Sequence, residues 1–146
     1  MSSVAAGSTI WITVWIVIDS SALAEIVMRT PRAPLVEELL VDADLIAPDL
    51  INAEVLSVVR GWLLRHVIDG AAAQRAVENL AMAPVRRMTT AALISRMWDW
   101  RQNLTPYDAS YVALAQRLAC PLLTLDHRLT RAPGLGVEVR TVESQG

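Results

Sequence analysis

The stretch WIVIDSSAL, residues 15–23, joins an apolar run to a short polar segment. Its first four residues are β-branched or aromatic, which is typical of a fully buried strand, and we expect this strand to end at Asp19. Residues 21–28 then place apolar side chains at helical spacing, at Leu23, Ile26 and Val27. A buried strand that leads directly into a helix is the building unit of a parallel α/β sheet.

The same alternation continues along the chain. Further strands are predicted at Leu45–Ala47 (stopped by Pro48), Val85–Met88, Leu122–Leu125 and Val137–Val142. Helices are predicted at Ser21–Met28 (broken by Pro31 and Pro34), Leu35–Val41, Asp49–Arg65, Asp69 to Met82, around Leu93 to Trp98, and Thr105–Leu118. In Asp49–Arg65 the apolar positions are Leu50, Ala53, Val55, Leu56, Val59, Leu63 and Leu64. This pattern predicts one α/β domain whose parallel sheet is covered on both faces.

The composition agrees with one folded domain. The chain has 146 residues, of which 53% are hydrophobic and 19% charged. An ordinary soluble domain is about 45–50% apolar and about 25% charged, so intrinsic disorder is excluded and a surface that meets a partner is expected. The net charge of −2 gives no overall basic field of the kind that attracts nucleic acid.

Two residue types exclude whole classes of protein. All 13 basic residues are arginine, and without lysine there is no phosphate-loop signature, Schiff-base lysine or lysine-dependent phosphotransfer site. The single cysteine, Cys120, excludes an internal disulfide and a cysteine-rich zinc site, and it favours the reducing cytoplasm. We expect Cys120 to be a small buried apolar residue.

The N-terminal part contains the apolar run Ile10–Ile18. Nine residues are too few for a membrane helix, which needs roughly 20, and no arginine precedes Arg29 to form the basic start of a secretory signal. We therefore expect a buried strand here, with no membrane association. Residues 1–13 are expected to form a disordered extension, and residues 14–143 the folded domain.

Four acidic residues occupy positions of chemical interest. Asp19 and Asp126 each follow a predicted strand directly, and the carboxyl ends of parallel strands meet at one edge of a sheet, where ligands gather. Glu54 lies in the first turns of the helix after Pro48. Asp108 lies near the start of another helix, and the sequence alone does not place that helix at the same edge.

Carboxylates brought together repel each other. At ~5 Å and an effective dielectric constant near 20, each pair costs on the order of 3 kcal/mol, so such a cluster takes up protons or recruits cations. A site made only of oxygen ligands favours Mg²⁺ or Mn²⁺, which activate water and stabilise the leaving oxygen of a phosphodiester. Each acid also has a structural alternative: a helix cap for Asp19, a capping box with Thr105 for Asp108, a solvated position for Glu54 and a turn for Asp126.

The ordered set of motifs resembles the PIN-domain ribonucleases, specifically the VapC-type toxins of toxin–antitoxin pairs. The resemblance runs from about residue 15 to 132 and rests on VIDSSAL (17–23), APDL (47–50), Glu54-Val55, NLTPYDA (103–109), YVALA (111–115) and LLTLDHRL (122–129). It implies a five-stranded parallel sheet sandwiched by helices and Mg²⁺- or Mn²⁺-dependent endonuclease cleavage of RNA. It also implies a homodimer inhibited by a small VapB-type antitoxin.

The resemblance assigns roles residue by residue. Asp19, Glu54, Asp108 and Asp126 correspond to the acidic, metal-binding cluster of the family. Thr124 corresponds to the polar residue near the metal, and Ser21 to a hydroxyl beside the first acid. Arg101 and Arg128 flank these motifs, and either can hold an RNA phosphate or be a solvated surface residue.

Other residues carry weaker signals. Trp62, Trp98 and Trp100 stand at helical positions and are expected in the core or at an interface. His66 and His127 are too far apart to show a metal-ligand spacing. His127 stands beside Asp126, and two places are equally expected for it: near the site, or in a surface turn.

Other functions of α/β domains fit the sequence less well. A phosphotransfer receiver domain needs a lysine, and a haloacid-dehalogenase-like phosphatase needs a second aspartate where Ser21 stands. Gly134-Leu135-Gly136 lacks the third glycine of a dinucleotide-binding motif. A non-catalytic PIN-like module that binds RNA or protein is the remaining alternative, and metal-dependent RNA cleavage distinguishes it from a nuclease.

Overall fold

A parallel sheet runs through the middle of the structure, a computed structural model that describes residues 14–143. Its five strands are β1 (Val14–Ile18), β2 (Ala43–Pro48), β3 (Val85–Met88), β4 (Leu122–Leu123) and β5 (Val139–Arg140). The order across the sheet is β3-β2-β1-β4-β5, and every neighbouring pair is parallel. The predicted five-stranded parallel sheet is therefore confirmed.

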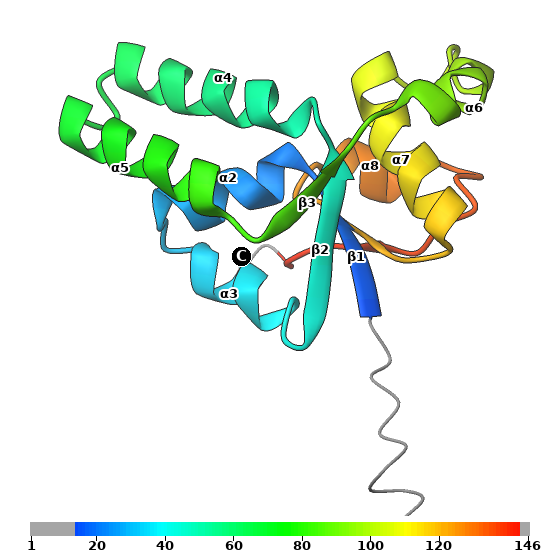
Figure 1. The fold of residues 1–146 in the computed structure, drawn as a ribbon, viewed down its shortest axis with the longest axis horizontal. Helices are drawn as coiled ribbons and strands as arrows, with labels where there is room; N and C mark the ends of the chain where they lie inside the picture. Colours follow the sequence, from blue (N-terminus) through cyan, green and yellow to red (C-terminus); the bar gives the residue numbers. More distant parts are fainter. Residues whose placement is uncertain (1–13, 144–146) are drawn as a thin grey trace, which may run out of the picture.

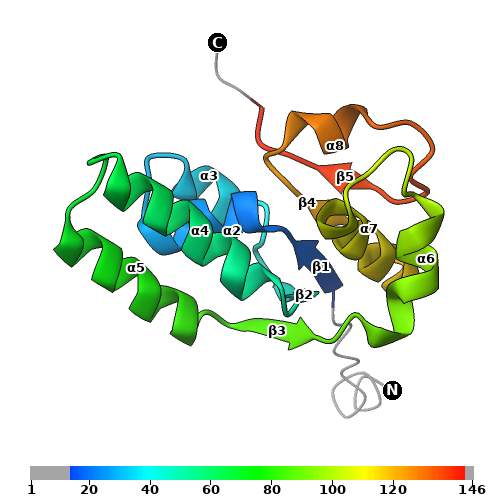
Figure 2. The same cartoon turned by 90° about the horizontal axis from the view of Figure 1, so that it is seen from above.

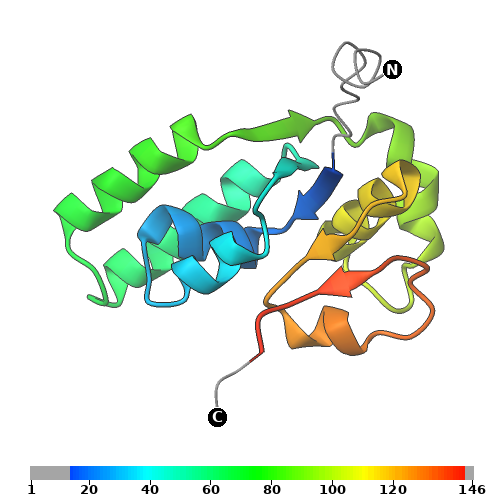
Figure 3. The ribbon, with the colours of Figure 1, turned by 90° about the horizontal axis from the view of Figure 1, so that it is seen from below.

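Helices cover both faces of this sheet (Figure 1). On one side lie α2 (Ser20–Met28), α3 (Ala33–Glu38), α4 (Ile51–Leu64) and α5 (Gly70–Met82), as the view from above shows (Figure 2). On the other side lie a short 3₁₀ turn (Ala91–Leu93), α6 (Ile94–Asp99) and α7 (Pro106–Leu118). The last helix, α8 (His127–Arg131), packs beside β5 at the sheet edge (Figure 3).

The core forms where β1 lies between β2 and β4. Val17 and Ile18 of β1 are completely buried, as an apolar strand covered on both faces must be. Ile51 and Val55 of α4 are buried on one side, and Val112 of α7 is buried on the other. The predictions for residues 1–13, including the start of the Ile10–Ile18 strand, lie outside the described residues, and the domain limits 14–143 stay a prediction.

Two predicted strands are longer than those observed. Leu122–Leu125 contains only the two-residue strand β4. After Leu123 the backbone hydrogen-bonds to a side chain in place of a neighbouring strand, since the N–H of Leu125 donates to Ser21 Oγ at 2.9 Å. The prediction Val137–Val142 was likewise too long for β5. As an edge strand, β5 has only the short β4 as its partner.

Two helix predictions also need correction. Pro34 does not end a helix; it occupies the first turn of α3, where its missing N–H costs nothing. In α4 the buried stripe is the narrow one of Ile51, Val55 and Val59, because one side of the helix packs on α2 and α5. The predicted apolar positions that are exposed instead are Ala53, Leu56 and Leu64.

The tryptophans and Cys120 differ in burial. Trp100 is buried in the core as predicted, whereas Trp98 is 65% exposed and Trp62 is half-buried. Cys120 is only partly buried, contrary to prediction, because it lies at the turn between α7 and β4. Across residues 14–143, the structure contains no helix long and apolar enough to cross a membrane.

Candidate active site

Asp19 and Asp126 lie at the same edge of the sheet. Asp19 follows β1 and caps the N-terminus of α2, and Asp126 follows β4 and caps α8. The strands β1 and β4 are neighbours, with Ile18 in register with Leu123. This placement is the one predicted from strand ends, and it falls where the connections from neighbouring strands diverge to opposite sides of the sheet.

Two hydroxyl groups hold the carboxylate of Asp19, whose residue is only 5% exposed. Ser21 Oγ donates to Oδ1 at 2.6 Å, and Thr124 Oγ1 donates to Oδ2. Each hydroxyl is itself fixed by a backbone N–H: that of Leu125 donates to Ser21 Oγ, and that of Asp126 donates to Thr124 Oγ1, both at 2.9 Å. The loop after β4 and the start of α2 therefore orient Asp19 jointly.

Burial makes Asp19 a weaker acid than an ordinary aspartate. Desolvation raises its pKa to about 6, although hydrogen bonds from Ser21, Thr124 and the N–H of Ala22 act in the opposite direction. Repulsion from Asp126 raises it further. Asp19 thus carries a negative charge at neutral pH that the neighbouring groups compensate only in part, and such a charge favours a bound cation.

The other acids come from two helices. Glu54 lies in α4, and Asp108 in the first turn of α7, whose N-terminal cap is Thr105. Both carboxylates are half-buried, and desolvation raises the pKa of each. The capping interaction runs from the N–H of Asp108 to Thr105 Oγ1 at 3.1 Å. The Thr105 hydroxyl also acts on the carboxylate of Asp108, whose pKa it lowers against the larger effect of burial.

Repulsion connects all four carboxylates in pairs. Asp126 raises the pKa of Asp19 and of Asp108, and Asp108 raises that of Glu54. Even so, no three His, Cys, Asp or Glu side chains within residues 14–143 lie close enough together to hold a metal ion. The structure therefore brings the four predicted acids into one electrostatically coupled region without assembling them into a finished metal cage.

Arg128 occupies part of this region. Its guanidinium contacts Asp126 at 2.6 Å and lies 4.0 Å from Asp108, and its hydrogen bonds to Asp126 lower the pKa of that carboxyl. Glu54 is held elsewhere, because Tyr111 donates a hydrogen bond to its Oε1 at 2.6 Å. Tyr111 was not among the site residues predicted from the sequence, although its position three residues after Asp108 places both on one side of α7.

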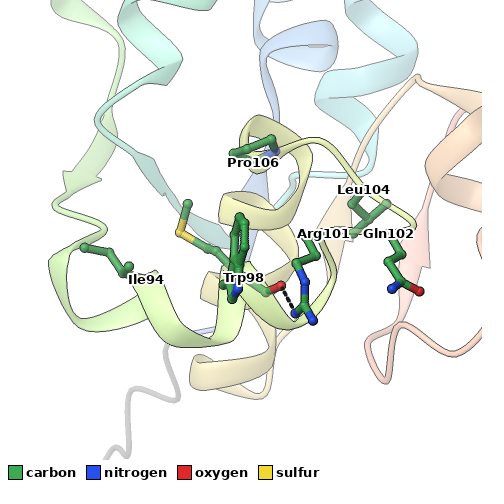
Figure 4. Close-up of a pocket in the computed structure, with 7 residues that line it drawn as sticks. Ile94, Trp98, Arg101, Gln102, Leu104 and Pro106 are labelled. Carbon is green, nitrogen blue, oxygen red and sulfur yellow. Dashed lines mark hydrogen bonds between the residues drawn. The ribbon is translucent and has the colours of Figure 1, made fainter.

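Arg101 lies apart from the acids. Its guanidinium donates to the carbonyl of Trp98 at 3.1 Å and lies 5.1 Å from the centre of the indole ring. Both residues line a largely apolar surface pocket of about 760 Å³ formed by α6 and the segment leading into α7, which includes Leu104 and Pro106 (Figure 4). These contacts with Trp98 place Arg101 outside the region of the four acids.

The fold and the acids at its carboxyl edge define a PIN domain. The PIN domain family model matches residues 16–135, and the chain belongs to this family. Within the family it is one of the VapC ribonucleases of toxin–antitoxin systems, as its curated relatives show.

Two of these relatives are proteins of Mycobacterium tuberculosis. The chain is 36% identical over 115 residues to ribonuclease VapC9 of strain H37Rv, and the match covers 79% of this chain and 88% of that protein. It is 33% identical over 127 residues to ribonuclease VapC12 of the same strain, covering 87% and 98%.

Solved structures share the fold at low sequence identity. The Mycobacterium tuberculosis VapC20 toxin, described as cleaving the sarcin–ricin loop, matches with a TM-score of 0.60 and 19% identity over 84% of this chain and 98% of that one. The VapBC2 structure from Rickettsia felis matches with a TM-score of 0.63 and 11% identity over 88% and 99%.

Proposed function

We propose that this chain is a Mg²⁺- or Mn²⁺-dependent endoribonuclease and the toxin of a type II toxin–antitoxin pair. The observation that carries the proposal is Asp19: a buried carboxylate, fixed by Ser21 and Thr124 and coupled to Asp126, which follows the neighbouring strand β4. The ribonuclease names of the relatives support the same activity.

The donor set suits a hard divalent cation. Asp19, Asp108 and Asp126, with Glu54 beside them, offer only carboxylate oxygens, which Mg²⁺ and Mn²⁺ prefer. Such an ion, when bound, supplies an activated water and stabilises the leaving oxygen of the cleaved phosphodiester. Burial raises the pKa of Asp19 and Asp108, and repulsion from Asp126 adds to it; a bound cation would relieve this repulsion.

The remaining side chains prepare this region for RNA. Ser21 and Thr124 keep Asp19 in one orientation, as partners of metal-binding carboxylates commonly do. Arg128 at the acids and Arg101 beside Trp98 present guanidinium groups that bind phosphate oxygens. These arginines hold the RNA backbone and do not read its sequence.

An RNA cleavage assay tests the enzyme proposal against a non-catalytic RNA- or protein-binding module. We expect cleavage of single-stranded RNA with Mg²⁺ or Mn²⁺, none in EDTA, and little action on duplex DNA. Asp19→Asn abolishes cleavage, whereas Asp44→Asn at the exposed amino end of β2 leaves it unchanged. Cleavage that persists in EDTA excludes the metal mechanism. If the intact chain does not cleave RNA at all, the non-catalytic binding module is the favoured function.

The partners belong to the same proposal. The relatives in solved structures include the VapBC2 complex and FitAcB from Neisseria gonorrhoeae, and exposed apolar residues here, such as Leu56, Leu64 and Trp98, offer surface for association. We expect a homodimer by light scattering at micromolar concentration and relief of growth arrest on co-expression with the cognate antitoxin. A strict monomer, or arrest that persists within the complex, contradicts these two expectations respectively.

A further inference from the structure

Tyr111 is a buried polar residue outside the predicted acidic set. It lies in the middle of α7 and is 2% exposed, and its hydroxyl donates to Glu54 Oε1 at 2.6 Å. Burial and the nearby carboxylate raise the pKa of Tyr111, so the hydroxyl keeps its proton and remains a donor. A buried phenol stabilises its surroundings only when its O–H has a partner, and here that partner is one of the four acids.

The hydrogen bond crosses between two layers of the fold. Glu54 stands on α4, which packs on α2 and α5, whereas Tyr111 and Asp108 stand on α7, which packs on β1, β2, β4 and α6. Figure 2 shows α4 and α7 on opposite sides of the sheet. The contact between Tyr111 and Glu54 therefore fixes the position of one acid-bearing helix relative to the other at the carboxyl edge.

Glu54 needs such a partner. Desolvation and repulsion from Asp108 both raise its pKa and disfavour the charged form, while the hydrogen bond from Tyr111 acts in the opposite direction. A glutamate side chain also has several rotatable bonds, whose freedom is lost when a ligand is bound. The hydroxyl of Ser20 also hydrogen-bonds this carboxylate and lowers its pKa, but the stronger of the two hydrogen bonds comes from Tyr111, at Oε1.

We propose that Tyr111 is a positioning residue: its hydroxyl holds Glu54 in one orientation beside Asp108 and thereby prepares that carboxylate for the divalent ion. This inference rests on the proposed metal-dependent activity and assigns it one more residue. Partners that orient metal ligands commonly change metal affinity about 10–100-fold when removed.

The variant Tyr111→Phe tests the inference, because it removes the hydroxyl and keeps the buried ring. In the full chain, we expect the Kd for Mn²⁺ measured by calorimetry to rise about tenfold, with excess Mn²⁺ restoring much of the lost RNA cleavage. Ser110, a buried residue of the same helix whose hydroxyl donates to the backbone carbonyl of Tyr107, provides the control, and Ser110→Ala leaves the Kd unchanged. Thermal melting in EDTA checks that both variants fold.

A second background separates positioning from a general structural effect. In Glu54→Ala the hydroxyl of Tyr111 has no carboxylate to orient, so adding Tyr111→Phe is expected to leave the Kd for Mn²⁺ where Glu54→Ala puts it. An equal loss of affinity in that background overturns the proposal, as does an unchanged Kd in Tyr111→Phe alone. If the unmodified chain neither binds Mn²⁺ nor cleaves RNA, the proposed function fails as well, and this outcome differs from a failure of Tyr111 alone.

Discussion

Arg128 donates hydrogen bonds to the carboxylate of Asp126 from two guanidinium nitrogens, Nε and Nη2, and the shorter one, from Nη2, is 2.6 Å long. Only one residue, His127, separates this pair in the sequence, and the N–H of Arg128 donates to the same carboxylate at 2.9 Å. The same guanidinium lies 4.0 Å from Asp108. One side-chain cation therefore neutralises part of the charge of Asp126, and under the proposed function Arg128 and a divalent ion would compete for this carboxylate.

This competition predicts opposite effects in one variant. Arg128→Ala frees Asp126 and Asp108, so we expect severalfold tighter Mn²⁺ binding, while RNA binding weakens and depends less on salt. Arg101→Ala shares the effect on RNA but not the effect on Mn²⁺, because Arg101 contacts Trp98 and not an acid. Calorimetry with Mn²⁺ and RNA titrations at several salt concentrations measure both. An unchanged salt dependence in both variants would identify these arginines as solvated surface residues.

The buried charge of Asp19 predicts that its removal does not destabilise the metal-free protein. Asparagine keeps the shape and caps helices as well as aspartate, so Asp19→Asn in EDTA is expected to be as stable as the parent, or more stable by on the order of 1–3 kcal/mol. It also loses RNA cleavage and most of the thermal stabilisation by Mg²⁺. Asp19→Ala is the contrasting variant, because it deletes the cap and the partner of Ser21 and Thr124, and it melts lower. A large drop in melting temperature for Asp19→Asn would make Asp19 chiefly a structural cap.

The raised pKa of Asp19 also predicts how stability varies with pH. The ordinary value is 3.8 and burial raises the folded-state pKa to about 6, so over this interval the folded protein holds a proton that the unfolded chain has released. The metal-free parent therefore loses stability as pH rises from about 4 to about 6 through this group. Because Asp19→Asn lacks the titration, its stability advantage in EDTA grows across this window and is constant above it. Urea unfolding of both chains at several pH values measures the difference, and a pH-independent difference contradicts the assigned shift.

The start of α7 separates helix capping from metal binding. Thr105→Ala removes the hydroxyl that accepts from the N–H of Asp108, and we expect it to cost about 1 kcal/mol of stability while Mn²⁺ binding persists. Asp108→Asn keeps that backbone hydrogen bond, so its stability in EDTA changes little while Mn²⁺ binding and cleavage are lost. Chemical denaturation and calorimetry on the two variants give the comparison. Equal losses of stability would show that the carboxylate of Asp108 is itself part of the cap.

Residues at strand ends were the predictable part of the site. Asp19 and Asp126 each follow an apolar strand, and the rule that carboxyl ends of parallel strands share an edge was enough to place both. The sheet itself followed from alternating apolar patterns. The lengths of β4 and β5 did not. The end of β4 depends on Leu125 donating to Ser21, a contact between residues 104 positions apart, and β5 has only the short β4 as its partner.

The side-chain arrangement around the acids was not predictable for a similar reason. Glu54 meets Tyr111 across 57 residues of sequence, through the packing of two helices on opposite sides of the sheet. For Asp108 the sequence offered both a place in the acidic cluster and a capping role with Thr105. In the structure Thr105 caps through the backbone N–H of Asp108, while the carboxylate lies 4.0 Å from Arg128 and is repelled by Asp126, so the two roles do not exclude each other. Such details depend on tertiary packing, and local patterns in the sequence do not encode them.

The two halves of the sheet differ in how firmly they are held. β1 and β2 pair over four residues. In contrast, β4, which leads to Asp126, has only two residues and pairs on its outer side with the two-residue edge strand β5. Amide protons of the β4–β5 half should therefore exchange with solvent through local opening, at a lower free energy than those of β1 and β2. Such an opening carries Asp126 and Thr124 away from Asp19 while the rest of the domain stays folded. On warming, activity is then lost before the fold, and the temperature at which the enzyme stops working lies below the temperature at which it melts.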